Sequence, residues 1–173
     1  MIGYPWAFLR DKRGAAALEM ALWLTLLVVP MANVVDIGFY VFKRMQVETA
    51  VQAGVQAAWA SCVAYTAQPK GTACGSAMTT AINTAVASTS LGSSVTVVSG
   101  YPTEGPYCPD ASGVLQSVAS YKMSCASAGY PAGTAGDYIR LRVTYSYTPL
   151  FSGASVTSLL PTPIARDAWI RLG

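Results

Sequence analysis

The chain has 173 residues, of which 53% are hydrophobic and only 11% are charged, against about 25% charged in typical soluble domains. Its net charge of +3 is small and its basic residues are scattered, which argues against nucleic-acid binding. The absence of histidine excludes Ser-His-Asp and Cys-His catalysis in their usual form and removes the commonest metal ligand. We therefore expect no catalytic residues, no cofactor and no metal.

The first predicted element is a membrane-spanning helix at residues 15–35. A short basic leader ends at Gly14, and an apolar run follows it. As a helix, this run would be about 31 Å long at 1.5 Å per residue, which matches a bilayer core of about 30 Å. Pro30 lies inside the run, and its missing N–H predicts a kink or a local break there.

One acidic residue, Glu19, enters this apolar run. On insertion scales a charged side chain deep in lipid costs roughly 2.5–3.5 kcal/mol. Removal of the leader after Gly14 would create an ammonium group on Ala15, with an ordinary pKa of about 8. Glu19 could pair with such a group within one chain or between neighbours, and pairing between chains would set the axial register of stacked helices. The alternative is that Glu19 lies at the headgroup level and stays hydrated.

The segment from the leader to Glu19 resembles the N-terminus of prepilins of the tight-adherence (Tad) class, and is closest to the minor, pseudopilin-like TadE/TadF group. The shared pattern is a basic leader that ends in Gly, a small first mature residue, Glu at the fifth mature position and a long helix. Gly14, Ala15 and Glu19 match it, whereas Met20 stands where the family often has an aromatic residue. A second segment, residues 143–151, resembles the strand and aromatic-proline turn near the C-terminus of TadE-like proteins.

This resemblance implies a function and a set of partners. It implies cleavage after Gly14 by a membrane-embedded prepilin peptidase. It also implies a single-pass protein of the bacterial inner membrane, whose C-terminal domain lies in the periplasm or, within a pilus, outside the cell. The implied role is that of a minor pilin or pseudopilin that primes or tips a Tad-type pilus for adhesion. The implied partners are other pilins, platform membrane proteins, a cytoplasmic ATPase and the peptidase.

Three alternatives to this function remain open on the sequence. A secretory signal peptide would have its apolar core at residues 21–29 and would be cleaved after Ala32, although Pro30-Met31-Ala32 matches the small-x-small rule poorly. A membrane-anchored binding module, such as an adhesin, would use its globular domain without polymerising. An exported enzyme has little support, because the chain lacks histidine and an acid pair.

The helix that starts at residue 15 is predicted to continue to about residue 60. An apolar stripe at helical spacing indicates this continuation, and it consists of Val47, Val51, Val55 and Ala58. We expect the stripe to pack on the chain's own globular domain. Gly38 and Gly54 are predicted to be weak points in the helix or places of close approach.

Residues 61–173 predict a globular domain, and the chain as a whole predicts an α+β fold in which a long helix lies across a small antiparallel sheet, as in pilins. A loop is expected at residues 71–75, followed by a helix at residues 76–88 with Ser76 as its cap. Alternating and β-branched residues predict the strands, at 94–98, 114–123, 138–148 and 164–172. An irregular loop is predicted at residues 100–113.

Four cysteines lie beyond the apolar run, at Cys62, Cys74, Cys108 and Cys125. No pair has CxxC spacing, which argues against a zinc site or a thioredoxin-like motif. An even number in an exported domain predicts disulfides. Of the three connectivities we favour the sequential pairing, because it closes the two shortest loops. The alternative is four buried free thiols.

Four charged residues of the globular part have a second interpretation. Asp110 and Asp137 lie in Gly/Pro-rich segments and could contribute to a calcium site. Arg140 and Arg142 could bind an anionic partner, although their alternation with apolar residues is more typical of a solvated sheet face.

Overall fold

The computed structural model describes residues 12–151, 153 and 155–172, which fall into two compact units. The first unit is Met1–Val41 with Thr148–Leu160, and the second is Phe42–Tyr147 with Pro161–Gly173. Helix α1 (Lys12–Cys62) contributes to both, because the boundary falls within it. Residues 1–11 of the predicted leader lie outside the described residues.

The first unit combines the N-terminal part of α1 with the segment that joins strand β4 (Gly136–Tyr145) to strand β5 (Ile164–Arg171). This segment includes a short 3-10 helix, η4 (Val156–Leu159). Helix α1 continues through Pro30, so the predicted local break is absent. Proline removes a single N–H from the ladder, and the remaining hydrogen bonds of a 51-residue helix hold it together.

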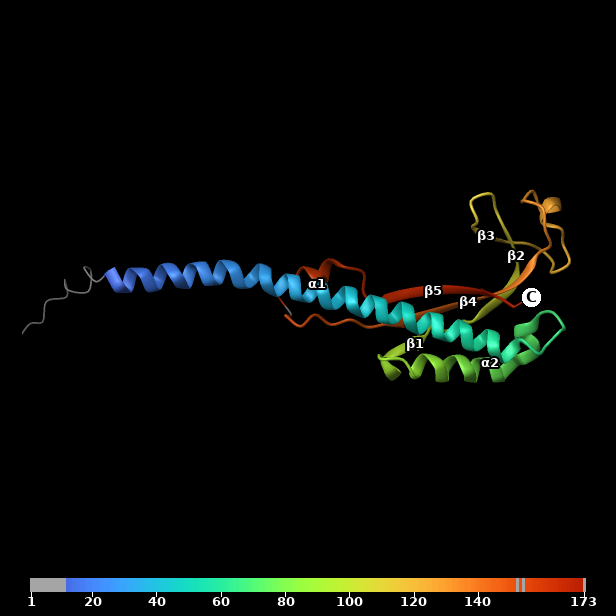
Figure 1. Cartoon of the computed structure of the whole chain (residues 1–173), viewed down its shortest axis with the longest axis horizontal. Coiled ribbons are helices and arrows are strands. Elements are labelled where there is room, and N and C mark those ends of the chain that lie inside the picture. The colour runs from blue at the N-terminus through green and yellow to red at the C-terminus, as the bar shows by residue number, and fades with distance from the viewer. Residues whose placement is uncertain (1–11, 152, 154, 173) are drawn as a thin grey trace, which may run out of the picture. The chain divides into compact units, whose positions relative to one another are not determined.

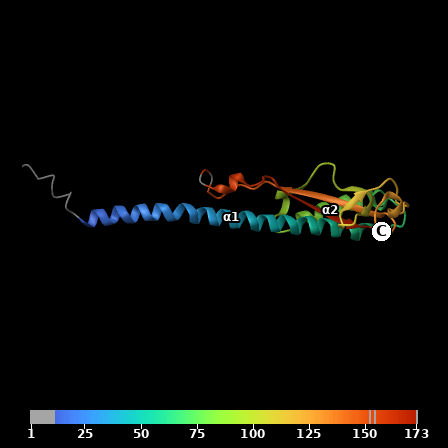
Figure 2. The ribbon, with the colours of Figure 1, turned by 90° about the horizontal axis from the view of Figure 1, so that it is seen from above.

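The second unit contains the sheet and the C-terminal part of α1, and the chain has the predicted α+β arrangement (Figures 1 and 2). Helix α2 (Lys70–Ala87) runs beside α1 on the face of the sheet that the core covers. The strands are antiparallel, and β4 pairs with β5 along one edge. Along the other edge of β4, strands β1 (Val95–Val97) and β2 (Thr103–Pro109) pair with its two ends. Strand β3 (Leu115–Ser117) pairs with the free edge of β2.

The core of the second unit lies between the two helices and the sheet. The stripe predicted on α1 is confirmed, since all four of its residues are buried. Apolar residues of α2 and β4 are buried as well, namely Met78, Ile82, Val86, Ile139, Leu141 and Val143. Gly54 is a place of close approach, because a Cβ added there would lie 2.5 Å from Leu141 Cδ2 and 3.0 Å from Val86 Cγ2. At Gly38 nothing lies within 4 Å of such an atom.

Helix α2 corrects two sequence predictions. It begins at Lys70, so residues 71–74 are helical rather than a loop, and the cap of the whole element is not Ser76. Only Gly75 has a non-helical conformation, which separates the first turn from the rest of α2. Pro69 stands at the N-cap position without a side-chain hydrogen bond. Gly75, with a φ of 50°, bends the helix, which glycine allows at little cost. The earlier start has a cause far along the chain, since carboxylates of the sheet bind the first N–H groups of α2.

Strand β2 corrects a third prediction, because it lies where the sequence indicated an irregular loop. Pro106 and Pro109 lower the strand propensity of this segment. Nevertheless, β2 pairs with β4 on one side and with β3 on the other. Hydrogen bonding to two neighbours therefore outweighs the local preference. Strand β3 is also shorter than predicted, and β4 ends at Tyr145 rather than at residue 148.

Candidate functional site

The part of α1 in the first unit exposes nearly all of its large apolar side chains. Leu18 is 67% exposed, Trp23 60% and Val34 69%. Glu19 and Asp36 are the only charged residues between positions 14 and 41. Among the described residues, α1 is one helix that is long and apolar enough to cross a membrane, and little of its most apolar stretch is buried. A continuous apolar surface of this kind marks a membrane or protein contact.

The predicted processing residues lie at the start of the described helix. Gly14 and Ala15 are both exposed in α1, and nothing lies within 4 Å of a Cβ added at Gly14. The first N–H groups of a helix have no intrahelical partner. The backbone near this end can therefore unwind for cleavage of a peptide bond with little loss of hydrogen bonding. The Gly14–Ala15 bond is therefore accessible.

Glu19 is also exposed on α1. Within the described part of the chain its carboxylate forms no ion pair; the pairs present there join Arg140 and Arg142 to Asp167, and Arg166 to Glu48. The Ala15 nitrogen is bonded to Gly14 in this unprocessed chain, so it carries no ammonium group.

Asp36 is the other charge of this region, and its surroundings are the opposite of those of Glu19. Its side chain is fully buried, because the segment between β4 and β5 lies against it. Asp36 Oδ1 accepts a hydrogen bond from the Leu150 N–H at 2.9 Å, and Oδ2 accepts one from the Phe151 N–H at 3.3 Å. One turn earlier, Asn33 Oδ1 accepts a hydrogen bond from the Val156 N–H at 2.7 Å. The sequence analysis assigned Asp36 no role, since its partners lie 114 and 115 residues away.

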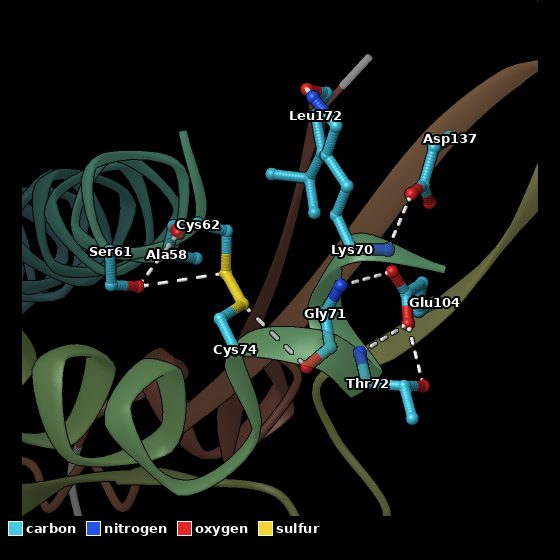
Figure 3. Close-up of a disulfide and its surroundings, with 10 residues drawn as sticks. All are labelled: Ala58, Ser61, Cys62, Lys70, Gly71, Thr72, Cys74, Glu104, Asp137 and Leu172. Atoms are coloured by element: carbon cyan, nitrogen blue, oxygen red, sulfur yellow. Dashed lines mark hydrogen bonds between the residues drawn. A yellow bond between two sulfur atoms is a disulfide. The ribbon is translucent and has the colours of Figure 1, made fainter. Parts of the chain in front are cut away.

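Both disulfides of the favoured sequential pairing are present, Cys62–Cys74 and Cys108–Cys125. The first joins the C-terminal end of α1 to α2 (Figure 3). The second joins β2 to the short 3-10 helix η3 (Cys125–Ala128). All four sulfur-bearing residues are buried, and such bonds are typical of oxidising compartments.

Two carboxylates from the sheet cap the N-terminus of α2, which explains its early start (Figure 3). Asp137 Oδ2 accepts a hydrogen bond from the Lys70 N–H at 2.9 Å. Glu104 accepts hydrogen bonds from the Gly71 N–H and, at 3.0 Å, from the Thr72 N–H. Anionic groups at this position satisfy free N–H groups and complement the helix dipole. No capping residue within α2 itself is needed.

The acidic residues considered for calcium are engaged in these local roles. Burial raises the pKa of Asp137; the Lys70 N–H opposes this, and the neighbouring Glu104 adds to it. Hydrogen bonds from Ser112, Gln116 and the Val114 N–H lower the pKa of Asp110 to about 2. Among the described residues, no group of three or more potential metal ligands is present. The structure therefore gives no support to a calcium site.

The arginines of β4 lie on the sheet face opposite the core. Arg140 Nε and Arg142 Nε lie 3.4 Å and 3.5 Å from Asp167 Oδ1. The Arg140 guanidinium also stacks 5.2 Å from the ring centre of Trp169 and 5.8 Å from that of Tyr101. This cluster is half-exposed and polar at its centre, as expected for a solvated face.

The family model described as "TadE-like protein" matches residues 14–56. The matched range begins at Gly14 and includes Glu19 and Asp36, so the N-terminal resemblance is confirmed. The resemblance at residues 143–151 lies outside it. No curated protein and no solved structure gives a significant match.

Proposed function

Because residues 14–56 are a TadE-like segment, which links the chain to the Tad pilus system, we propose that this protein is a minor pilin or pseudopilin. In this role it takes part in pilus assembly for adhesion, at priming or at the tip. The observation that carries the proposal is the α1 surface over residues 14–31, which is apolar on all sides, exposed and interrupted near its start by Glu19. A surface of this kind is suited first to lipid and then to neighbouring helices.

The first step of the proposed mechanism is processing. A prepilin peptidase hydrolyses the Gly14–Ala15 bond, which leaves a carboxylate on Gly14 and an ammonium group on Ala15. The exposure of both residues supports access to this bond. The mature chain then stays in the inner membrane through α1, with the disulfide-bonded domain on the periplasmic side. The disulfides support that orientation, because they form in oxidising compartments.

The second step is registration between subunits. A carboxylate in a low-dielectric environment is costly unless it is paired. The Ala15 ammonium of a neighbouring pilin would relieve that cost for Glu19, and only one axial offset brings the two groups together. The other partners in this account are platform membrane proteins and the cytoplasmic ATPase, which drive insertion.

The test separates processing from assembly. A Gly14→Ala chain should keep its leader, which intact mass measures. A Glu19→Ala chain should be processed normally, but its cross-linking to other pilins in cells should fall at least tenfold. Glu48→Ala is the matched control, because it removes another α1 carboxylate whose partner, Arg166, belongs to the same chain. If Glu19→Ala cross-links as well as the Glu48→Ala control, the registration mechanism is wrong.

A membrane-anchored binding module that does not polymerise is the second candidate. The half-exposed cluster of Arg140, Tyr101 and Trp169 favours it, because aromatic and guanidinium groups together make an adaptable contact surface. Copurification with other pilins supports the first function. Isolation only as a monomer under the same conditions supports the second.

A further inference from the structure

The segment between β4 and β5 is held on α1 by backbone groups. Its Leu150 and Phe151 N–H groups bind the carboxylate of Asp36, and its Val156 N–H binds the side-chain oxygen of Asn33. All of these residues belong to the first unit. Figures 1 and 2 show the described part of the segment running beside α1. We call residues 148–151 and 155–160 the clamped segment.

Two polar side chains of the clamped segment are turned inside, and a third is bonded within the segment. Ser155 and Thr157 are buried, and their hydroxyl groups lie 2.7 Å apart. The Ser155 hydroxyl also accepts a hydrogen bond from the Thr157 N–H, and the Ser158 hydroxyl donates one to the Ser155 carbonyl. The segment therefore satisfies polar groups internally, as an environment poor in water requires.

Its large apolar side chains, in contrast, point outward. Leu159 is 85% exposed and Leu150 is 57% exposed, and Phe151 and Val156 are each 45% exposed. Residues 148–160 contain no charged side chain. A surface turn of a water-soluble domain normally has the reverse pattern, with polar groups outside. This reversal indicates an apolar neighbour.

The attachment points fix the level of this apolar surface along α1. The apolar run ends at Val35. Asn33 lies two residues before that end, and Asp36 is the first residue after it. At 1.5 Å per residue these two side chains are about 4.5 Å apart along the axis. The clamped segment is thus attached where the membrane-spanning run ends. At this level lipid headgroups meet acyl chains, and apolar side chains penetrate about 5–10 Å.

We propose that the clamped segment docks on the outer surface of the lipid bilayer that α1 crosses, with Leu150, Phe151 and Leu159 inserted among the lipids. The inference rests on the proposed membrane anchoring of α1. Asp36 and Asn33 hold the segment at the interface, and the segment in turn shields the Asp36 carboxylate from lipid. A bilayer fits this surface better than a second protein, because its large exposed side chains are all apolar, no residue of the segment carries a charge, and the exposed Ser158 hydroxyl is already bonded to the Ser155 carbonyl.

The test places a single probe at the tip of the segment in the full chain. A Leu159→Cys chain is labelled with an environment-sensitive fluorophore, since the four native cysteines are in disulfides. The labelled protein is placed, one chain per disc, in nanodiscs of phosphatidylcholine and phosphatidylglycerol. Quenching is measured with nitroxide on the lipid headgroup region and with iodide in water. Val28→Cys reports the membrane span, and Ala111→Cys reports the β2–β3 turn.

Docking predicts that the Leu159 probe is quenched at least threefold more by the nitroxide lipid than the Ala111 probe, and is protected from iodide. If the Leu159 probe behaves like the Ala111 probe while the Val28 probe is quenched by lipid, the docking inference is wrong and the anchor stands. If the Val28 probe is not quenched by lipid either, the membrane anchor itself fails. Protection from iodide without quenching by lipid would show that the probe is buried against protein rather than lipid, and would also overturn the inference.

A second variant tests the clamp in the same discs. Asp36→Ala removes the acceptor of the Leu150 and Phe151 N–H groups, so the Leu159 probe should lose most of its lipid quenching. Glu48→Ala removes an α1 carboxylate that contacts Arg166 instead, and it should leave the quenching unchanged. Equal quenching in these two variants would contradict the role of Asp36.

Discussion

The two parts of α1 belong to one helix but have opposite surroundings. Before residue 42, the large apolar side chains lie on all sides, and all of them except Tyr40 are exposed. After it, apolar residues recur on one face and are buried, while Gln52 and Gln56 lie on the exposed side. A helix that is apolar all round requires surroundings that its own chain does not provide, whereas a striped helix completes its own domain. The difference therefore divides α1 into an exposed apolar part and a folding part.

The largest expected effect comes from the glycines of the two parts. Gly54→Leu should lower the stability of the second unit by about 3 kcal/mol, because the added atoms overlap Leu141 and Val86. Gly38→Leu has open space around it and should leave stability unchanged or slightly raised, since leucine favours a helix. Thermal unfolding of the full chain in detergent, followed by near-UV circular dichroism, measures both; a loss of 3 kcal/mol corresponds to roughly 6–12 °C. Similar shifts in melting temperature for Gly54→Leu and Gly38→Leu would contradict the difference in packing between the two parts of α1.

A smaller effect is expected from valine truncation on the same helix. Val51→Ala should cost about 2 kcal/mol, because it deletes two buried methyl groups and leaves a cavity. Val34→Ala deletes the same groups from an exposed site and should not change the melting temperature. The same melting experiment applies. Should Val34→Ala destabilise the chain as much as Val51→Ala, the first part of α1 would also be packed within its own fold.

Sequence reasoning identified both parts of α1, because each has a local signature: an uninterrupted apolar run in one and a stripe at helical spacing in the other. The alternating residues of β4 were equally informative. The missed features depend on partners far along the chain. Helix α2 begins at Lys70 because Glu104 and Asp137 bind its first N–H groups, and Asp36 is buried by residues of the clamped segment.

The α2 cap provides the smallest predicted effect, and it concerns only the folding part. The pKa of Asp137 is raised in the folded chain, so the unfolded chain releases this proton first. The contribution of Asp137 to stability should therefore decrease as the pH rises from about 4 through its folded pKa, and should be fully present below that range. Asp137→Asn has no proton to release, and its amide can donate to Glu104 while its oxygen still accepts from Lys70.

We expect Asp137→Asn to remove this decrease and to raise the melting temperature at pH 7. Glu104→Ala, which removes the acceptor of the Gly71 and Thr72 N–H groups, should instead cost about 1 kcal/mol. Melting temperatures between pH 4 and pH 7 compare the two variants with the unaltered chain. A pH profile of Asp137→Asn that matches the unaltered chain would contradict the assignment.

The central claim is that the first part of α1 becomes an assembly element only after a new amino group appears beside Glu19. The most direct measurement is the N-terminal residue of the chain isolated from its native membrane, by intact mass and N-terminal sequencing. This account predicts Ala15, with the whole apolar run retained. A chain that begins at Met1, or one that begins at Asn33 after loss of that run, would contradict it.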